Sequence, residues 1–195
     1  MTAVDEYLAQ VRGAMFGMDP RVRDDILLEL RSHLGEAAAA NGGDVGRAIG
    51  AMGPAAHVGR EYRAVYGYSR GYQFLFALIA AVLAALTLPV LQGSTSAYGN
   101  PYYLPNLLAL PFLVVVLGWL LWVSMRAGSR AGLYAGLGGF AGRMVAAAGL
   151  VAGPSGGIVT AGGLVVLVLS SALLVLVGWL PGTAKKAWSK PAAEL

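Results

Sequence analysis

The chain has 195 residues, of which 57% are hydrophobic and only 12% are charged, whereas an ordinary soluble domain carries about 25% charged residues. Residues 1–70 carry 8 basic and 9 acidic side chains, and residues 71–195 carry 6 basic and 1 acidic, which together give the net charge of +4. The excess of basic residues therefore flanks apolar segments and does not indicate a nucleic-acid-binding surface, and the absence of cysteine excludes disulfides, thiolate metal sites and cysteine nucleophiles.

Residues 1–70 have the pattern of a small helical domain and no apparent signal peptide, because a polar, charged helix opens the chain. Apolar residues recur at helical spacing over 4–15, and Gly17 ends this helix. Asp19-Pro20 begins a second helix, with aspartate as N-cap and proline in the first turn. Asp44 caps a third helix, and Gly53-Pro54 leads into a fourth. Seven residues are expected in the domain core: Tyr7, Leu8, Ile26, Leu30, Leu34, Ile49 and Tyr62.

The order of these segments resembles the HAAS-type signalling domain. A helix at VDEYLAQVRGAM, a helix at DPRVRDDILLELRSHLGEA and the segment AIGAMGPAAHVGREYRAVYG are similar to the "YL" helix, the I-x-x-E-L-x-S-H helix and the A-I-x-x-M/L-G-x-P turn of that family. The resemblance covers about residues 3–66. It departs from the family at Gly53, which Pro54 follows directly. The resemblance implies a cytoplasmic domain ahead of transmembrane helices, often encoded beside PadR-like transcription regulators.

Four apolar segments follow this domain. Residues 71–125 contain no Asp, Glu, Lys or Arg, and residues 72–92 and 107–125 are each long enough to cross about 30 Å of hydrocarbon as a helix. The polar stretch between them contains three tyrosines and predicts a short loop with an aromatic girdle. Residues 131–152 are apolar but rich in glycine, and residues 158–180 form a strongly apolar block closed by Pro181. A buried helical hairpin of a soluble protein is disfavoured, because nothing else in the chain would cover it.

The fold class expected is therefore all-α. A four-helix cytoplasmic domain at 1–70 precedes a bundle of about four transmembrane helices within 71–184 and a cytoplasmic tail at 185–195. Arginines precede the first span (60, 63 and 70) and follow the second (126 and 130), whereas the loop at 93–106 has no Lys or Arg. This distribution predicts a cytoplasmic N-terminus in the plasma (inner) membrane. If 131–152 instead lies in the interface, the lysine-bearing tail is outside. Four spans are favoured over three.

Small residues and one cation give the third apolar segment a distinct face. Small residues let helix backbones approach closely in lipid. An arginine near the bilayer centre costs about 2.5–3.5 kcal/mol, so it should face protein, water or a lipid phosphate. No acidic residue occurs between Glu61 and Glu194, so a carboxylate partner in the membrane would come from another chain. A weakly helical interfacial segment and an arginine that reaches a headgroup are the alternatives. The candidate helix-packing or partner-binding residues are Gly128, Gly132, Gly136, Gly139 and Arg143.

Motifs for catalysis are weak. Residues 153–156, Gly-Pro-Ser-Gly, match the G-x-S-G of intramembrane serine proteases, but a serine nucleophile needs a base. The two histidines, His33 and His57, belong to the N-terminal domain and lack the companions of a metal site. The glycines of the third apolar segment do not fit G-x-G-x-x-G and follow no strand. No catalytic, cofactor-binding or metal site is expected, and the protein is not expected to be an enzyme.

The sequence thus predicts a membrane-anchored signalling or accessory protein. Its helical domain is expected to contact a cytoplasmic protein partner, for which the resemblance suggests a PadR-like regulator, without direct binding of nucleic acid. One alternative is a structural subunit of a larger membrane complex, which the glycine face and the unpartnered arginine would suit. A small transporter or channel subunit is a weaker alternative, because Arg143 is essentially the one ionisable side chain within the spans.

Overall fold

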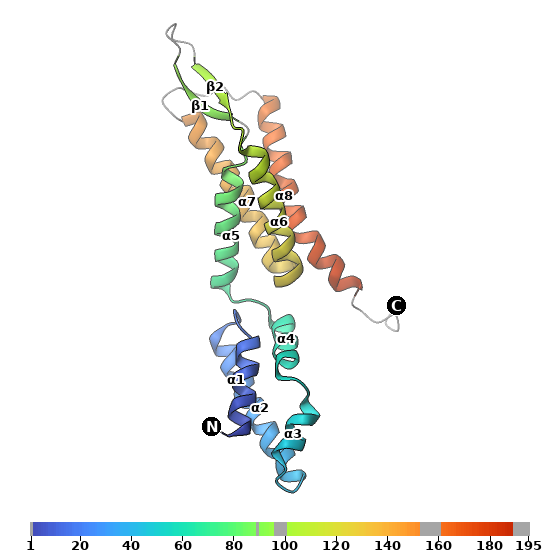
Figure 1. The fold of residues 1–195 in the computed structure, drawn as a ribbon. Coiled ribbons are helices and arrows are strands. Elements are labelled where there is room, and N and C mark those ends of the chain that lie inside the picture. The colour runs from blue at the N-terminus through green and yellow to red at the C-terminus, as the bar shows by residue number, and fades with distance from the viewer. Residues whose placement is uncertain (1, 89, 96–100, 153–160, 189–195) are drawn as a thin grey trace. The chain divides into compact units, whose positions relative to one another are not determined.

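Figure 1 shows the fold of the computed structural model, which describes residues 2–88, 90–95, 101–152 and 161–188. These described residues form eight α-helices and one short β-hairpin, so the predicted all-α class is confirmed. The chain divides into two compact units, Met1–Tyr72 and Gln73–Leu195, each with its own packing.

The N-terminal unit contains four helices, as the sequence predicts: α1 (Ala3–Ala14), α2 (Pro20–Ala40), α3 (Val45–Met52) and α4 (Ala55–Tyr66). The first turn of a helix has backbone N–H groups with no partner inside the helix, and a polar side chain just before it can accept from them. Three of the four helices begin at such a side chain: Thr2, Asp19 and Asp44.

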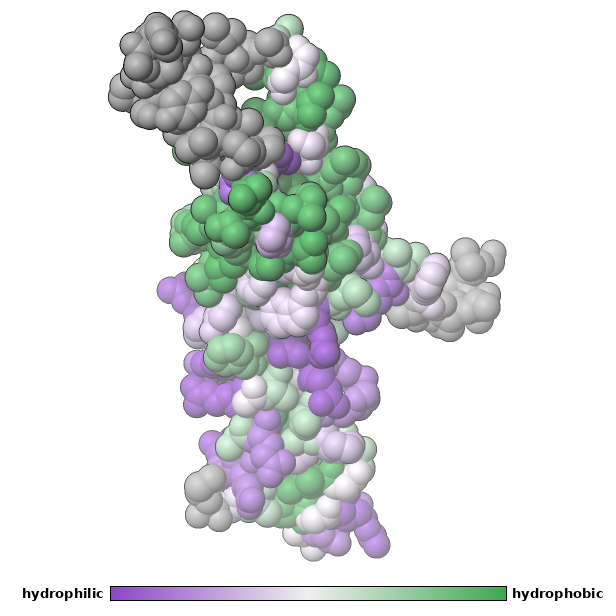
Figure 2. Space-filling model, turned by 45° about the horizontal axis from the view of Figure 1, so that its top comes forward, coloured by the Kyte–Doolittle hydropathy of each residue, from purple (hydrophilic) through white to green (hydrophobic). Residues whose placement is uncertain are grey.

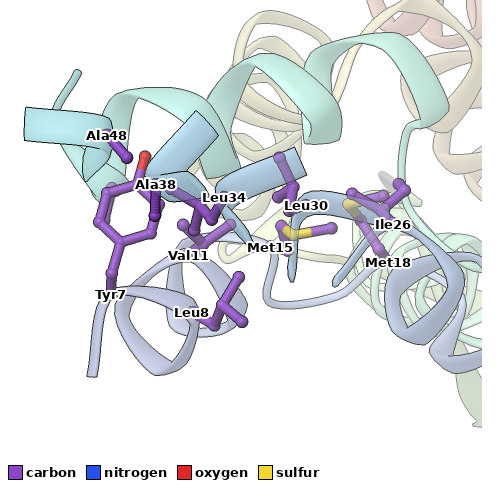
Figure 3. Close-up of a cluster of buried hydrophobic side chains, with 11 residues drawn as sticks. Tyr7, Leu8, Val11, Met15, Met18, Ile26, Leu30, Leu34, Ala38 and Ala48 are labelled. Carbon is purple, nitrogen blue, oxygen red and sulfur yellow. The ribbon is translucent and has the colours of Figure 1, made fainter. Parts of the chain in front are cut away.

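The core of this unit lies mainly between α1 and α2 (Figure 3). Five of the seven expected core residues are buried in it: Tyr7, Leu8, Ile26, Leu30 and Leu34. The other two, Ile49 of α3 and Tyr62 of α4, are partly buried and pack against the same cluster. Val11 of α1 and Met15, which directly follows that helix, have no exposed surface, so the α1 side is the innermost part of the core.

Helices α1 and α4 approach each other closely at Gly59. A Cβ atom at this position would lie 2.6 Å from the Ala14 Cβ and 2.7 Å from the Val11 carbonyl oxygen. Both distances are well inside van der Waals contact, so only glycine permits this packing. The sequence did not single out Gly59, because a glycine inside a helical pattern carries no sign of the helix that it meets.

The second unit begins within α5 (Arg70–Ala85) and also contains β1 (Val90–Thr95), β2 (Pro101–Pro105), α6 (Ala109–Ala127), α7 (Ser129–Ala152) and α8 (Ala161–Trp188). Helices α6, α7 and α8 each have the length and composition of a membrane span, and a fourth span is counted when α5 is joined with α4. Large apolar side chains cover the surface of this unit (Figure 2). An apolar surface of this extent belongs in hydrocarbon, so the chain is a membrane protein.

Helix α5 is shorter than the apolar block from which it was predicted. The block extends to Gln92, but the helix ends at Ala85. The chain turns at Thr87, whose hydroxyl donates to the Ala84 carbonyl oxygen at 2.7 Å. Pro89 follows in the sequence, and a proline disfavours helical dihedrals in the residue before it. Hydropathy identifies apolar residues but does not indicate where a helix turns, so the predicted span was too long.

The connection between α5 and α6 contains an antiparallel hairpin rather than only the predicted loop. Strand β1 pairs with β2, with Val90 opposite Pro105. The side-chain amide of Asn106 then donates to the carbonyl oxygens of Leu86 at 3.0 Å and Leu88 at 2.9 Å. One asparagine thus ties the end of α5 to the approach to α6. The tyrosine side chains of the predicted girdle lie outside the described part of the chain.

Helix α8 extends beyond its predicted end. Pro181 was expected to close the block at Leu180, but the helix continues to Trp188 with the proline inside it. A proline removes one donor from the helix and disturbs the hydrogen bonds around it. The next N–H, that of Gly182, donates to the Ser124 hydroxyl of α6 at 2.9 Å. This contact from a neighbouring helix accommodates the proline, and the predicted start of the tail at 185 lies within a helix.

Candidate functional site

Helix α7 packs against α8 through two of the predicted glycines. A Cβ atom at Gly136 would lie 2.7 Å from the Val175 Cα and 2.9 Å from the Leu174 carbonyl oxygen of α8. At Gly132 it would overlap the Gly178 carbonyl oxygen of α8. The atoms that the added carbon would meet belong to the backbone and cannot rotate away. These glycines therefore serve helix packing within the chain.

A second glycine pair on α7 faces α5. A Cβ atom at Gly138 would overlap the Ala77 carbonyl oxygen, and one at Gly142 would overlap the Ala81 carbonyl oxygen. Gly139 lies between the two contacts, with room for a methyl group at 3.5 Å from Leu174 Cδ1. Helix α7 thus has close neighbours on two sides. The small-residue spacing of 138 and 142 is visible in the sequence, but not the helix that it meets.

Gly128 is placed differently from the other predicted glycines. It has a φ of 92° and lies between the end of α6 and the start of α7, with no atom within 4 Å of an added Cβ. The expected helical face therefore begins at Gly132. A positive φ is the conformation that glycine adopts most readily, so Gly128 allows the turn between the two helices rather than a close helix contact.

Arg143 lies inside the helix bundle with few partners. Only 7% of its surface is exposed, and its Nη1 donates to the Ser170 hydroxyl of α8 at 3.1 Å. That hydroxyl in turn donates to the Leu167 carbonyl oxygen at 3.1 Å. Among the described residues, the buried Nε of Arg143 has no acceptor. A buried charge whose partner in the described part of the chain is a neutral hydroxyl is unfavourable, which marks this position as a candidate site.

The N-terminal unit carries a groove of about 360 Å³ along α1 and α2. Its lining is mostly apolar but includes three charged residues. The lining residues are Asp5, Leu8, Ala9, Arg12, Leu27, Leu28 and Arg31. Leu28 is 75% exposed although it lies among apolar neighbours. A leucine left open beside an apolar groove is the feature expected where a partner side chain binds.

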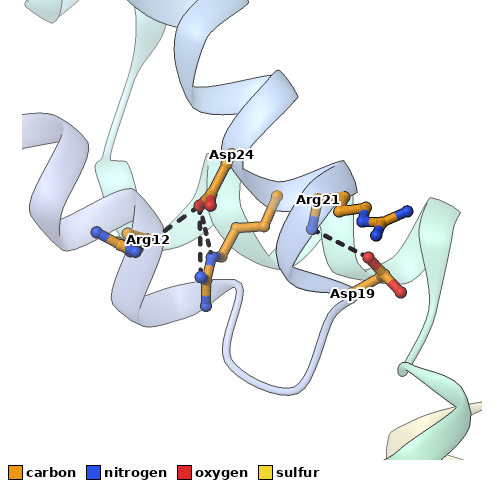
Figure 4. A network of polar contacts seen from close by, with 5 residues as sticks. Arg12, Asp19, Arg21 and Asp24 are labelled. Carbon is orange, nitrogen blue, oxygen red and sulfur yellow. Dashed lines mark hydrogen bonds and ion pairs between the residues drawn. The ribbon is translucent and has the colours of Figure 1, made fainter.

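Two arginines that line this groove, Arg12 and Arg31, form ion pairs, and Figure 4 shows the pair between Arg12 and Asp24. The Asp24 carboxylate of α2 lies 3.7 Å from the Arg12 guanidinium of α1 and accepts a hydrogen bond from its neighbour Arg23 at 3.3 Å. On the other side Asp5 pairs with Arg31. Hydrogen bonds from Thr2, and to a smaller extent the charge of Arg31, hold the pKa of the Asp5 carboxyl below its ordinary value. Both arginines at the edge of the groove therefore have a carboxylate within reach, Arg12 at the longer distance.

The segment that builds this core and groove matches a known family, HAAS, over residues 6–61. The chain carries a HAAS domain. The domain covers most of α1, all of α2 and α3 and half of α4, which agrees with the resemblance in the sequence. It includes six of the seven expected core residues. Comparisons with curated proteins and with solved structures found no match.

Both histidines lie on the surface of the HAAS domain. His33 Nε2 is 3.6 Å from Glu29, and His57 Nε2 is 3.1 Å from Glu61, one helical turn away in each case. All four side chains are more than half exposed. No group of three or more potential metal ligands occurs among the described residues. The Gly-Pro-Ser-Gly motif at 153–156 lies outside the described residues.

Proposed function

We propose that this chain is a membrane-anchored regulatory or accessory protein that acts through protein contacts of its HAAS domain and catalyses no reaction. The observation that carries the proposal is the apolar groove along α1 and α2 within that domain. The apolar helices of the second unit support the membrane anchor. The distribution of arginines around the spans favours a cytoplasmic HAAS domain in the plasma (inner) membrane.

The shape and charge of the groove suit an amphipathic helix with acidic side chains beside its apolar face. Grooves between two helices commonly bind such helices. Leu8, Leu27 and Leu28 offer the apolar contact. The Arg12 guanidinium is 58% exposed and 3.7 Å from Asp24, a surface pair that contributes little and that a partner carboxylate can replace. A PadR-like regulator, to which the HAAS resemblance points, is the first partner to test.

The test measures binding of a purified PadR-like regulator to the full chain in nanodiscs. The substitution Leu28→Gln removes the exposed apolar contact and should raise the Kd at least about tenfold, the effect expected of an interface anchor. Ala51→Gln is the matched control, because residue 51 is an exposed helical position outside the groove. Equal loss of binding in both variants would contradict a role for the groove, and no binding by the unaltered chain would contradict this choice of partner.

A structural subunit of a larger membrane complex is the second candidate, and Arg143 favours it. The second unit has no Asp or Glu before residue 194, so any carboxylate near Arg143 inside the membrane would come from another chain. Arg143→Leu should then leave the chain helical and inserted but abolish the native complex, as observed by native mass spectrometry in mild detergent. Ser170→Ala removes the acceptor that Arg143 has among the described residues and serves as the control for the intramolecular contact. A complex that survives Arg143→Leu would contradict this candidate.

A further inference from the structure

Exposed apolar side chains gather at one end of the N-terminal unit, where α5 begins. Phe16, after α1, is 62% exposed, and Val65 and Tyr66, at the end of α4, are 79% and 58% exposed. We call these three residues, together with Tyr68 and Tyr72, the aromatic collar. Leu28 apart, Phe16, Val65 and Tyr66 are the large apolar side chains exposed in the described residues of this unit. None of the collar residues lines the groove of the HAAS domain, so the collar is separate from it.

Ring contacts join three members of the collar, Phe16, Tyr68 and Tyr72. The Phe16 and Tyr72 rings meet edge to face with centroids 5.4 Å apart, and the Tyr68 and Tyr72 centroids are 6.1 Å apart. The guanidinium carbon of Arg63 lies 5.7 Å from the centre of the Tyr68 ring. Aromatic pairs in these geometries attract each other beyond the area that they bury, and so does a cation over a ring. Phe16, Tyr68 and Tyr72 therefore form one aromatic cluster within the collar.

The backbone after α1 is shaped to fit the collar. Gly17 has a φ of 88°, and a Cβ atom there would lie 2.7 Å from the Tyr68 ring. The Gly17 carbonyl oxygen also accepts a hydrogen bond from the Ser69 N–H at 2.8 Å. The turn that follows α1 and the segment that enters α5 are thus joined directly, which presents Phe16 beside Tyr72.

The length of chain between the collar and α5 limits how far this surface can lie from the start of that helix. Tyr66 is four residues from Arg70, a distance of at most about 14 Å along an extended chain. Soon after that point α5 exposes apolar residues one turn apart, Phe74, Leu78 and Val82, as a helix in contact with lipid does. The headgroup layer on each side of the hydrocarbon is about 5–8 Å thick. Residues so near the entry of α5 are within reach of that layer.

The charges of this end match anionic headgroups. Residues 60–72 carry Arg60, Arg63 and Arg70 against one acid, Glu61, which pairs with His57 at 3.1 Å. Tyrosine is enriched at the membrane interface because its ring is apolar and its hydroxyl is polar, and arginine beside the membrane is attracted by anionic lipids. We propose that the aromatic collar docks the N-terminal unit onto the headgroup layer and that anionic lipids strengthen this docking.

The absence of native cysteine makes the docking measurable in the full chain. Single cysteines replace Phe16 or Val65 in the collar, or Leu28 as the control, which is also an exposed apolar residue at 75%. Each variant carries a bimane label in nanodiscs of phosphatidylcholine and phosphatidylglycerol that contain a headgroup spin-labelled lipid. Labels at 16 and 65 should be strongly quenched, and the label at 28 should be quenched several-fold less. Equal quenching at all three positions, or none at 16 and 65, would overturn the proposal.

The lipid preference is tested with Arg60→Gln in the Val65→Cys chain. Loss of one arginine near an anionic surface should lower the docking equilibrium constant about fivefold in nanodiscs with phosphatidylglycerol and have little effect without it. Arg47→Gln is the control, because residue 47 is exposed on α3 and is distant in sequence from Phe16 and from residues 60–72. An equal effect of both substitutions would overturn the preference for anionic lipid. If a second copy covers the collar instead, the label at 65 is protected only in nanodiscs with two chains, and that outcome overturns docking to lipid.

Discussion

The glycine contacts of α7 predict that one added methyl group, at Gly132, pushes α7 away from α6 and α8. In Gly132→Ala the new Cβ would overlap the Gly178 carbonyl oxygen of α8 and lie 2.9 Å from the Ser124 Cα of α6. Both obstacles are backbone atoms on different helices, so no change of rotamer relieves the overlap. The bundle has to open on two sides at once.

The size of the effect follows from a comparison within the same helix. Overpacking of this kind costs about 1–3 kcal/mol. A glycine-to-alanine change also favours the helix by about 0.5–1 kcal/mol, at least in water, which partly conceals the loss. Gly149→Ala serves as the reference for this gain in helix propensity, because Gly149 is on α7 and has no atom within 4 Å of an added Cβ. We expect Gly132→Ala to be less stable than Gly149→Ala by about 1–3 kcal/mol.

The assay is equilibrium unfolding of the full chain in mixed micelles, with loss of helical circular dichroism as the signal. Gly149→Ala should unfold at the same or a higher denaturant fraction than the unaltered chain, and Gly132→Ala at a lower one. Equal midpoints for the two variants would refute the close contact of α7 with α6 and α8.

Three further predictions concern other parts of the chain. Leu30→Ala should destabilise the N-terminal unit by about 2–5 kcal/mol, because Leu30 is buried in its core, whereas Leu28→Ala should change the melting midpoint little. Ser124→Ala should cost about 1–3 kcal/mol by leaving the buried Gly182 N–H without an acceptor; an unchanged unfolding midpoint would contradict that contact. Cysteines introduced at Ser96 and Ser189, both outside the described residues, should react oppositely with an impermeant thiol reagent in intact cells, with position 96 labelled and 189 protected. Labelling at both would favour three spans.

Much of the N-terminal unit is determined locally by its sequence. Asp19 and Asp44 cap the helices that they were expected to begin, because their carboxylates accept from N–H groups two or three residues ahead. The apolar stripe of α2 points inward because its residues recur at helical spacing, and a small domain has one core in which to bury them. Neither inference needs knowledge of a distant residue. The HAAS motif, for the same reason, can be recognised in the sequence.

The packing of the second unit could be predicted only in part. Hydropathy identifies apolar helices, and glycine spacing identifies α7 as the one with close neighbours. The acceptor of Arg143 and the contact between Ser124 and Gly182 were not predicted. Each depends on residues far apart in the chain, such as Arg143 and Ser170. Each is also a single polar contact, which leaves no periodic pattern in the sequence.

The physical reason for this difference in predictability is that the N-terminal unit folds in water and the second unit in lipid. In water, burial of apolar surface drives a helix to turn its apolar stripe inward, so the sequence of the N-terminal unit determines both its helices and the faces that pack. In lipid, an apolar side chain is equally well placed outside or inside, so composition determined that the second unit lies in a membrane but not which faces meet. The close approach of backbones at Gly132, Gly138 and Gly178 decided that arrangement, and only the tertiary structure contains it.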